Sequence, residues 1–252
     1  MEFVADPGTA WCGSLEVFED LVKGVKAAGG TAIKPQLWPK KIYKGHKMKK
    51  EALKAHITRS TLRRMSDICV RHRLPMFCSV FSVWSFKMMM EVAADYPPMG
   101  ERVKISCGKN KAWGLIDTVL EWEVPQVLIS VASVEDVKAL KKHGVFDHQS
   151  DITLLYCVPN YPTKPGDVMF PRGWPEPITG FSDHTLGLVA PLTAAALGFD
   201  MIERHVMLSE ERYSIHIGEV PGFPDKVCAA TPPQFKTIVK ACKAARRMAG
   251  YD

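Results

Sequence analysis

The sequence predicts a single (β/α)8 TIM barrel of the α/β class, and three observations lead to this fold class. Eight short β-rich runs alternate with longer amphipathic segments, a pattern that favours parallel βαβ units. The length of 252 residues matches the roughly 250 residues of a one-domain barrel. Hydrophobic residues make up 46% and charged residues 24% of the chain, which indicates a globular protein with a sizeable core and argues against disorder.

The expected strands are short runs rich in aliphatic and aromatic residues. They span Glu2–Ala5, Thr31–Pro35, Pro75–Val80, Arg102–Ser106, Gln126–Val131, Ile152–Val158, Ile178–Phe181 and Asp200–Glu203. The expected helices span Ser14–Ala28, Lys50–Arg73, Val83–Ala94, Ala112–Glu121, Val134–His143, a less regular stretch at 165–175, Leu186–Leu197 and Pro232–Met248. Eight such units predict one barrel over residues 1–252.

Start and stop signals flank several of these helices. Ser14 is an N-cap before the apolar periodicity of LEVFEDLVKGV, and Gly29–Gly30 end that helix. Ser133 likewise begins SVEDVKALKKHG, with acidic residues in the first turn and lysines in the last. The stretch Pro159–Pro177 is expected to be a long functional loop, since βαβ-like sequence resumes beyond it.

Charge and cysteine content limit the compartment and the partners. The formal net charge of +6, from 33 basic and 27 acidic residues, suits an enzyme for anionic substrates and disfavours nucleic acid as a partner. Much of it lies in Lys40–Lys50, which is either a solvated loop and helix start or a contact for a substrate or polyanion. Seven scattered cysteines favour a reduced, intracellular compartment. The first residues, MEFVADPG, show no basic region followed by an apolar core, and no apolar run approaches ~20 residues, so a soluble cytoplasmic protein without membrane contact is expected.

Chemically versatile side chains gather where the expected strands end, which is where barrel enzymes place their active sites. Lys34 and Lys104 would face inward, where a lysine is costly to bury without an anion, so they indicate either an anionic ligand or structural carboxylates. His184 and His205 end neighbouring strands and either hold one divalent ion or are satisfied polar residues. Other residues at strand ends are Asp6, Gln36, Ser79, Ser82, Lys109, Ser130, Tyr161, Ser182, Asp183, Glu203 and Arg204.

Several blocks of the chain match a known family in order. They read LLYCVPNYPT at 154–163, GFSDHTLGL at 180–188 and ALGFDMIERHV at 196–206, with further matches in GSLEVFEDLVKGVKAAGGTAIKPQ, in VKISCG at 103–108 and in PDKVCAATPPQF at 224–235. Together these blocks resemble the sialic acid synthase family, which includes N-acetylneuraminate, legionaminate and pseudaminate synthases. The resemblance covers nearly the whole chain.

This resemblance implies a synthase that condenses phosphoenolpyruvate with an aldehyde or sugar acceptor and releases phosphate, using Mn²⁺ or Mg²⁺. His184 and His205 would be the metal ligands, and Lys34 and Lys104 would hold phosphoenolpyruvate. Asp6, a shortened counterpart of a family glutamate, could act as a base. Asp225 matches an acidic residue that contacts the acceptor. The residues implied to bind substrate are Gln36, Ser79, Cys107, Lys109, Ser130, Tyr161 and Ser182.

The sequence departs from the family mainly on the acceptor side. Cys107, Gly108 and Lys109 replace a Ser-Gly-Glu block, and Ala10–Trp11 replaces an Asn-His pair. The family's C-terminal antifreeze-like domain, which contributes an arginine to the partner subunit's site, is expected to be absent. These departures imply an altered acceptor, or a site completed by a homodimer partner or a separate chain.

Two other functional hypotheses stay open from the residues alone. A related metal-dependent lyase or hydrolase would use the same histidines and lysines. A non-catalytic barrel used for binding or assembly would explain the altered acceptor side. The retained lysines, histidines and carboxylate disfavour the second hypothesis, because each is costly to bury without a ligand.

Overall fold

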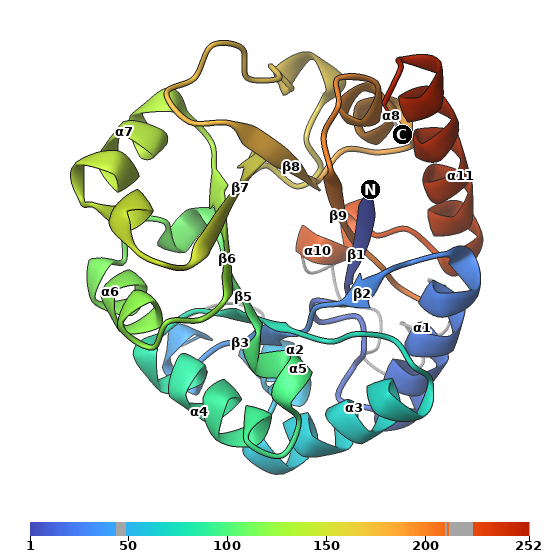
Figure 1. The fold of residues 1–252 in the computed structure, drawn as a ribbon. Coiled ribbons are helices and arrows are strands. Elements are labelled where there is room, and N and C mark those ends of the chain that lie inside the picture. Colours follow the sequence, from blue (N-terminus) through green and yellow to red (C-terminus); the bar gives the residue numbers. More distant parts are fainter. Residues whose placement is uncertain (44–48, 210, 212–223, 252) are drawn as a thin grey trace.

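The computed structural model describes residues 1–43, 49–209, 211 and 224–251, and its parallel strands curve into a single barrel (Figure 1). The strands are β1 (Glu2–Asp6), β2 (Ala32–Ile33), β3 (Gln36–Leu37), β4 (Cys78–Val80), β5 (Arg102–Ile105), β6 (Gln126–Val131), β7 (Asp151–Cys157), β8 (Ile178–Asp183) and β9 (Met201–His205). Neighbouring strands follow the order β2, β1, β9, β8, β7, β6, β5, β4, β3. Since β2 and β3 are halves of one strand, the predicted (β/α)8 fold is confirmed.

The second barrel strand is interrupted at Lys34–Pro35, where one continuous strand was expected. Pro35 has no N–H to donate to a neighbouring strand, which explains the break. The barrel still closes here, because Ile33 forms a parallel bridge with Met76. The backbone N–H of Ser79 also donates to the carbonyl of Pro35 at 2.9 Å. The β2 segment pairs with β1, and β3 pairs with β4.

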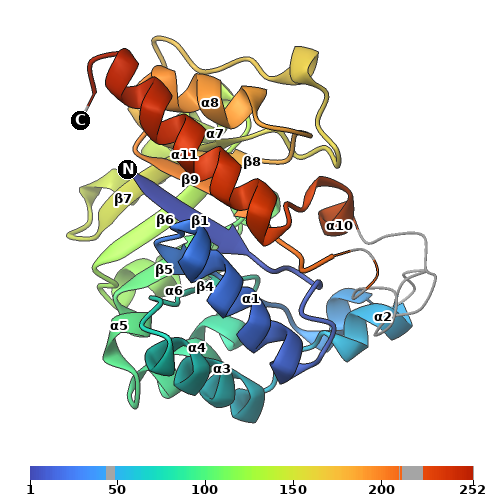
Figure 2. The ribbon, with the colours of Figure 1, turned by 90° about the vertical axis from the view of Figure 1, so that its right-hand side faces the viewer.

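Eight of the described α-helices surround the barrel: α1 (Leu15–Ala28), α3 (Arg59–Arg71), α4 (Val83–Ala93), α5 (Pro97–Gly100), α6 (Trp113–Glu121), α7 (Val134–Lys142), α8 (Val189–Ala196) and α11 (Pro232–Met248) (Figure 1). Two shorter helices, α2 (Lys49–Lys54) and α10 (Pro224–Cys228), lie at one end of the barrel (Figure 2). The last helix, α11, lies beside α1 on one flank (Figure 2). In the described part of the chain, no helix is both long and apolar enough to cross a bilayer.

The predicted N-caps are confirmed. The Ser14 hydroxyl accepts a hydrogen bond from the Val17 N–H at 3.3 Å, and the Ser133 hydroxyl accepts one from the Asp136 N–H at 3.2 Å. Gly29 ends α1 with a φ of 89°, a left-handed conformation that glycine adopts without a Cβ penalty.

Two expected helices differ in the structure. The helix expected over Lys50–Arg73 is two helices, because Thr58 caps a new one by accepting a hydrogen bond from the Thr61 N–H at 3.1 Å. The stretch 165–175 is not an α-helix. It contains only a short 3-10 turn, η4 (Pro165–Asp167), because its prolines lack the N–H groups that a helix needs.

The strands present two inward layers along the barrel axis, spaced by the two-residue period of a β-strand. The lower layer is an apolar cluster of Val4, Ala32, Phe77, Leu128, Leu155 and Met201. Two residues further along four of these strands, the inward positions become polar or titratable. They are Asp6 on β1, Ser130 on β6, Cys157 on β7 and Glu203 on β9. The apolar layer therefore forms the floor of a polar cavity.

Candidate active site

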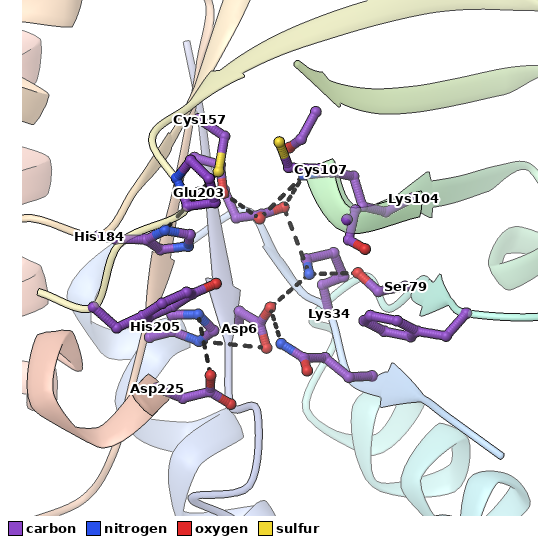
Figure 3. A pocket seen from close by; sticks show the side chains of 18 of the residues that line it. Asp6, Lys34, Ser79, Lys104, Cys107, Cys157, His184, Glu203, His205 and Asp225 are labelled. Atoms are coloured by element: carbon purple, nitrogen blue, oxygen red, sulfur yellow. Dashed lines mark hydrogen bonds and ion pairs between the residues drawn. The ribbon is translucent and has the colours of Figure 1, made fainter. Parts of the chain in front are cut away.

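A cavity of about 300 Å³ opens at the carboxyl ends of the strands (Figure 3). Strand register brings its residues side by side: Asp6 lies opposite His205, and Ser79 lies opposite both Gln36 and Lys104. The cavity is lined by twelve of the thirteen predicted site residues: Asp6, Lys34, Gln36, Ser79, Lys104, Cys107, Ser130, Tyr161, Ser182, His184, His205 and Asp225.

Lys109 is the predicted site residue that does not line the cavity. It ends the 3-10 turn η2 (Cys107–Lys109), which follows β5 and leaves the inward alternation of the strand. The cations predicted at 40–50 fall partly on residues 44–48, which lie outside the described residues.

Lys34 connects three elements of the site. Its ammonium donates to Asp6 Oδ2 and to Ser79 Oγ, each at 2.6 Å, and lies 3.6 Å from Glu203 Oε2. Burial by itself would lower the pKa of Lys34, but Asp6 and Glu203 outweigh it and raise the pKa. Gln36 Nε2 also donates to Asp6 Oδ2, at 2.8 Å. Lys34 is therefore held as a cation by the carboxylates of Asp6 on β1 and Glu203 on β9.

Lys104 is paired with Glu203, which received no role from the sequence. The Lys104 ammonium donates to Glu203 Oε1 at 3.1 Å and to Oε2 at 3.0 Å, and Ser182 Oγ donates to Oε1 at 2.8 Å. Burial raises the pKa of Glu203, but Lys104 and Lys34 oppose it and the net direction is downward. Burial lowers the pKa of Lys104, with Lys34 adding to that effect and Glu203 opposing it.

The cavity has no excess of positive charge in its lining. Two lysines, Lys34 and Lys104, face three carboxyl groups, those of Asp6, Glu203 and Asp225. Of the two alternatives that the sequence left open for the lysines, structural carboxylates are present, because protein carboxylates pair with both ammonium groups. An anion carrying several charges would have to compete with these carboxylates or enter with a cation.

A second buried ion pair lies on the other side of the sheet. Arg204 pairs with Asp183 Oδ2, and Asp183 Oδ1 accepts hydrogen bonds from the N–H and the hydroxyl of Thr185 at 2.8 and 2.7 Å. Neither Arg204 nor Asp183 lines the cavity, because alternation along β9 turns Arg204 away from Glu203 and His205.

The two predicted metal ligands lie next to each other. The rings of His184 and His205 are stacked with centroids 5.4 Å apart, and Tyr161 stacks on His184 at 4.1 Å. The Nδ1 atom of His184 lies 3.0 Å from the carbonyl of Val158, a contact that orients an imidazole for metal binding through its other nitrogen. Burial, and then His205, lower the pKa of His184 to about 3, so the ring is neutral at neutral pH.

His205 lies between two carboxyl groups. Its Nδ1 is 3.8 Å from Asp6 Oδ1, and its Nε2 is 3.9 Å from Asp225 Oδ1. Both distances exceed hydrogen-bond range. Within the described residues, no three His, Cys, Asp or Glu side chains already form a metal site. However, His205 Nδ1 and Asp225 Oδ2 are buried without hydrogen-bond partners, and imidazole and carboxylate donors suit a divalent cation. The residues therefore fit such an ion.

Aromatic and thiol groups complete the cavity wall. Trp38 and Phe81 lie with ring centroids 5.2 Å apart, and both line the cavity. The sulfur of Cys157, at the end of β7, lies 3.9 Å from His184 Nδ1. Sequence reasoning assigned no role to these three residues.

Buried lysines, carboxyl groups and imidazoles surround a cavity at the carboxyl ends of the barrel strands. Enzymes with this fold place their active sites at the same end. Residues 22–252 match the model of the NeuB family, and the chain belongs to that family. The resemblance inferred from the sequence blocks is thus confirmed.

Individual relatives are similar over different parts of the chain. An uncharacterized protein of Methanocaldococcus jannaschii is 32% identical over 158 residues, covering 58% of this chain and 43% of that protein. This chain thus spans less than half the length of that relative. The N,N'-diacetyllegionaminic acid synthase of Legionella pneumophila is 22% identical over 275 residues, covering 98% of this chain and 72% of the relative.

Solved structures share the fold. The N-acetylneuraminic acid synthetase of Leptospira borgpetersenii superposes with a TM-score of 0.81 at 20% identity, over 99% of this chain and 85% of that one. A spore coat polysaccharide biosynthesis protein of Bacillus subtilis gives a TM-score of 0.75 at 18% identity, over 99% and 69% of the two chains.

Proposed function

We propose that this protein is a synthase that joins phosphoenolpyruvate to an aldehyde or sugar acceptor and releases phosphate, with the help of a divalent cation. The observation that carries the proposal is the clustering of Lys34, Lys104, His184 and His205 around one cavity in a chain of the NeuB family. Relatives named as legionaminic and pseudaminic acid synthases support a sugar acid as the product.

The anionic substrate would bind on the lysine side of the cavity. Lys104 and Lys34 supply ammonium groups, while Ser79, Ser130 and Ser182 supply hydroxyls that can donate to phosphate or carboxylate oxygens. Since Lys104 already donates to both oxygens of Glu203, substrate binding would exchange part of this pairing for bonds to the ligand.

His184 and His205, with Asp6 and Asp225 beside them, would hold Mn²⁺ or Mg²⁺. Such a cation polarises a carbonyl oxygen and stabilises negative charge that develops on it. Lys34 and His205 lower the pKa of Asp6 against the effect of burial, so its carboxylate is ionised at neutral pH. In the proposed reaction, this carboxylate would accept a proton from an attacking water.

One observation favours a second candidate, a barrel that binds without catalysis. Both buried lysines are satisfied by Asp6 and Glu203, so neither requires a substrate to be stable. Release of phosphate from phosphoenolpyruvate in the presence of an acceptor separates the two candidates, because only the synthase produces it.

Binding of phosphoenolpyruvate tests the proposed site directly. At ~100 times its dissociation constant, with Mn²⁺ present, it is expected to stabilise the protein by about 2.7 kcal/mol, measured as a rise in melting temperature. With EDTA the rise should largely disappear, because the lining has no excess of positive charge. In Lys104→Met, which keeps the side-chain volume but not the charge, the rise should also be lost. An unchanged melting temperature in wild type with metal and millimolar ligand would refute the proposal.

The acceptor is proposed to differ from N-acetylmannosamine. Lys109 replaces a glutamate of the resembling family, and an ammonium cannot accept the hydrogen bonds of sugar hydroxyls. Losing one such bond costs about 1–3 kcal/mol, or roughly 10- to 100-fold in rate. Phosphate release with N-acetylmannosamine should therefore be slower than with an anionic aldehyde, and Lys109→Glu should narrow the difference. Lys109 lies outside the cavity lining. If wild type and Lys109→Glu release phosphate at the same rate with N-acetylmannosamine, Lys109 does not contact the acceptor.

A further inference from the structure

The cavity contains a pair of thiols on its lysine side. Cys107 follows β5 at the start of η2, and Cys157 is the last residue of β7. Both side chains line the cavity, and Figure 3 shows them facing each other beside Lys104 and Glu203. Their proximity shifts the pKa values of the two thiols in opposite directions, lowering that of Cys107 and raising that of Cys157.

Access distinguishes Cys107 from the other cysteines. All seven are free, and six of them are buried while Cys107 is partly exposed. A small oxidant that enters the cavity therefore meets Cys107 before Cys157, which is 2% exposed. The neighbouring Cys157 thiol lowers the pKa of Cys107, while burial and Asp136 oppose this shift and Lys104 aids it. Thiolate character and access together determine which cysteine reacts with an oxidant.

We propose that Cys107 and Cys157 form a peroxide-sensitive thiol switch that closes the lysine side of the cavity by a reversible disulfide. The Cys107 thiolate attacks an oxygen of hydrogen peroxide and breaks the O–O bond, which gives a sulfenic acid and, after protonation, one water. The Cys157 sulfur then attacks the sulfenic sulfur, the S–O bond breaks, and a second water leaves. Two electrons pass from the two thiols to the peroxide.

The consequence for ligand binding rests on the proposed function. A disulfide removes both S–H groups from the wall beside Lys104 and ties the end of β7 to η2. The turn η2, Cys107–Lys109, follows β5, and β6 lies between β5 and β7. Because neighbouring strands are about 4.8 Å apart and a disulfide brings two Cα atoms within about 7 Å, η2 would shift toward β7. This shift would narrow the space in which the phosphate or carboxylate of phosphoenolpyruvate would lie.

The disulfide is tested by mass, without any assay of activity. Wild-type protein treated with stoichiometric hydrogen peroxide should lose the mass of two hydrogen atoms, and peptide mapping should find Cys107 joined to Cys157. Cys107→Ser and Cys157→Ser should each prevent this crosslink. Cys78→Ser, a change at a buried cysteine that does not line the cavity, should not prevent it. Peroxide that consumes Cys107 in folded wild type without yielding the joined peptide overturns the proposal.

The effect on the site is measured separately. The rise in melting temperature caused by phosphoenolpyruvate and Mn²⁺ should be present in reduced protein, lost after peroxide and restored by dithiothreitol. A crosslinked protein that keeps the full rise refutes the closing of the cavity. If reduced protein shows no rise, the proposed function fails, while the crosslink is still decided by the peptide map.

Discussion

Replacing Glu203 with glutamine is expected to lower the free energy of unfolding by about 3–5 kcal/mol, because the change removes a buried carboxylate and leaves its partner unpaired. Glu203 is the carboxylate to which Lys104 donates, at 3.0 and 3.1 Å, and it lies 3.6 Å from Lys34. Glutamine keeps the shape of the side chain, so packing should change little. Urea unfolding of the two proteins at neutral pH measures the difference.

The pH dependence of this difference has a defined sign. Lys104 and Lys34 hold the pKa of Glu203 below its ordinary value of 4.5, against the effect of burial. A carboxyl group of this kind stabilises the fold above its unfolded pKa and loses that contribution as the pH falls toward its folded pKa. The stability gap between wild type and Glu203→Gln should therefore be full at neutral pH and shrink below pH 4.5. A difference in the free energy of unfolding that stays constant with pH would contradict the pairing of Glu203 with Lys104 and Lys34.

Glu203→Gln should at the same time keep or enlarge the stabilisation by phosphoenolpyruvate and Mn²⁺, because the lysines no longer have a competing carboxylate. The matched control is Asp183→Asn, which breaks the ion pair with Arg204 outside the cavity. It should also reduce stability but leave the effect of phosphoenolpyruvate unchanged. Loss of that effect in Glu203→Gln alone would show that Glu203 itself is needed to bind the anion.

Affinity for Mn²⁺ is expected to fall by roughly 100-fold or more in His184→Ala and in His205→Ala. Loss of an outer partner of a metal ligand already costs ~10- to 100-fold, and a ligand itself should cost at least as much. Titration calorimetry of each variant measures the change, and circular dichroism checks the fold.

The control for this experiment is His143→Ala. His143 also contacts a carboxylate, with its Nε2 2.6 Å from Asp117 Oδ1, and stacks on Trp113 at 4.2 Å, but it lies outside the cavity. Its removal should leave Mn²⁺ affinity unchanged. Wild-type affinity in the His184→Ala, His205→Ala double variant would overturn the assignment of these residues as ligands.

Much of this site could be predicted because a barrel brings the carboxyl ends of all its strands to one place. Lys104 and His205 needed only their positions at strand ends to be assigned to the same cavity. Glu203 could have been found too, since the two-residue period turns Glu203 and His205 inward and Arg204 outward. The break in the second strand could also have been predicted, because Pro35 cannot donate a hydrogen bond within a sheet.

Other features depend on contacts that the sequence does not encode locally. The pairing of Lys104 with Glu203 joins residues 99 positions apart, so the sequence could not decide between structural carboxylates and an external anion as partners of the lysines. Lys109 directly follows the cavity residue Gly108, yet the turn η2 leaves it out of the lining. The proximity of Cys107 to Cys157 depends on the direction in which the turn η2 leaves β5.

Lys34 lies where the second strand is interrupted between β2 and β3. The backbone still joins this strand to the next one, through the Ile33–Met76 bridge and the hydrogen bond from the Ser79 N–H to the Pro35 carbonyl among others. The Lys34 side chain adds a further link, because its ammonium donates hydrogen bonds to Asp6 on β1 and to Ser79 on β4. An anion that drew the Lys34 ammonium away from these partners would remove hydrogen bonds that join β1 to β4, so occupancy of the cavity would change the connection between the two strands on either side of the break.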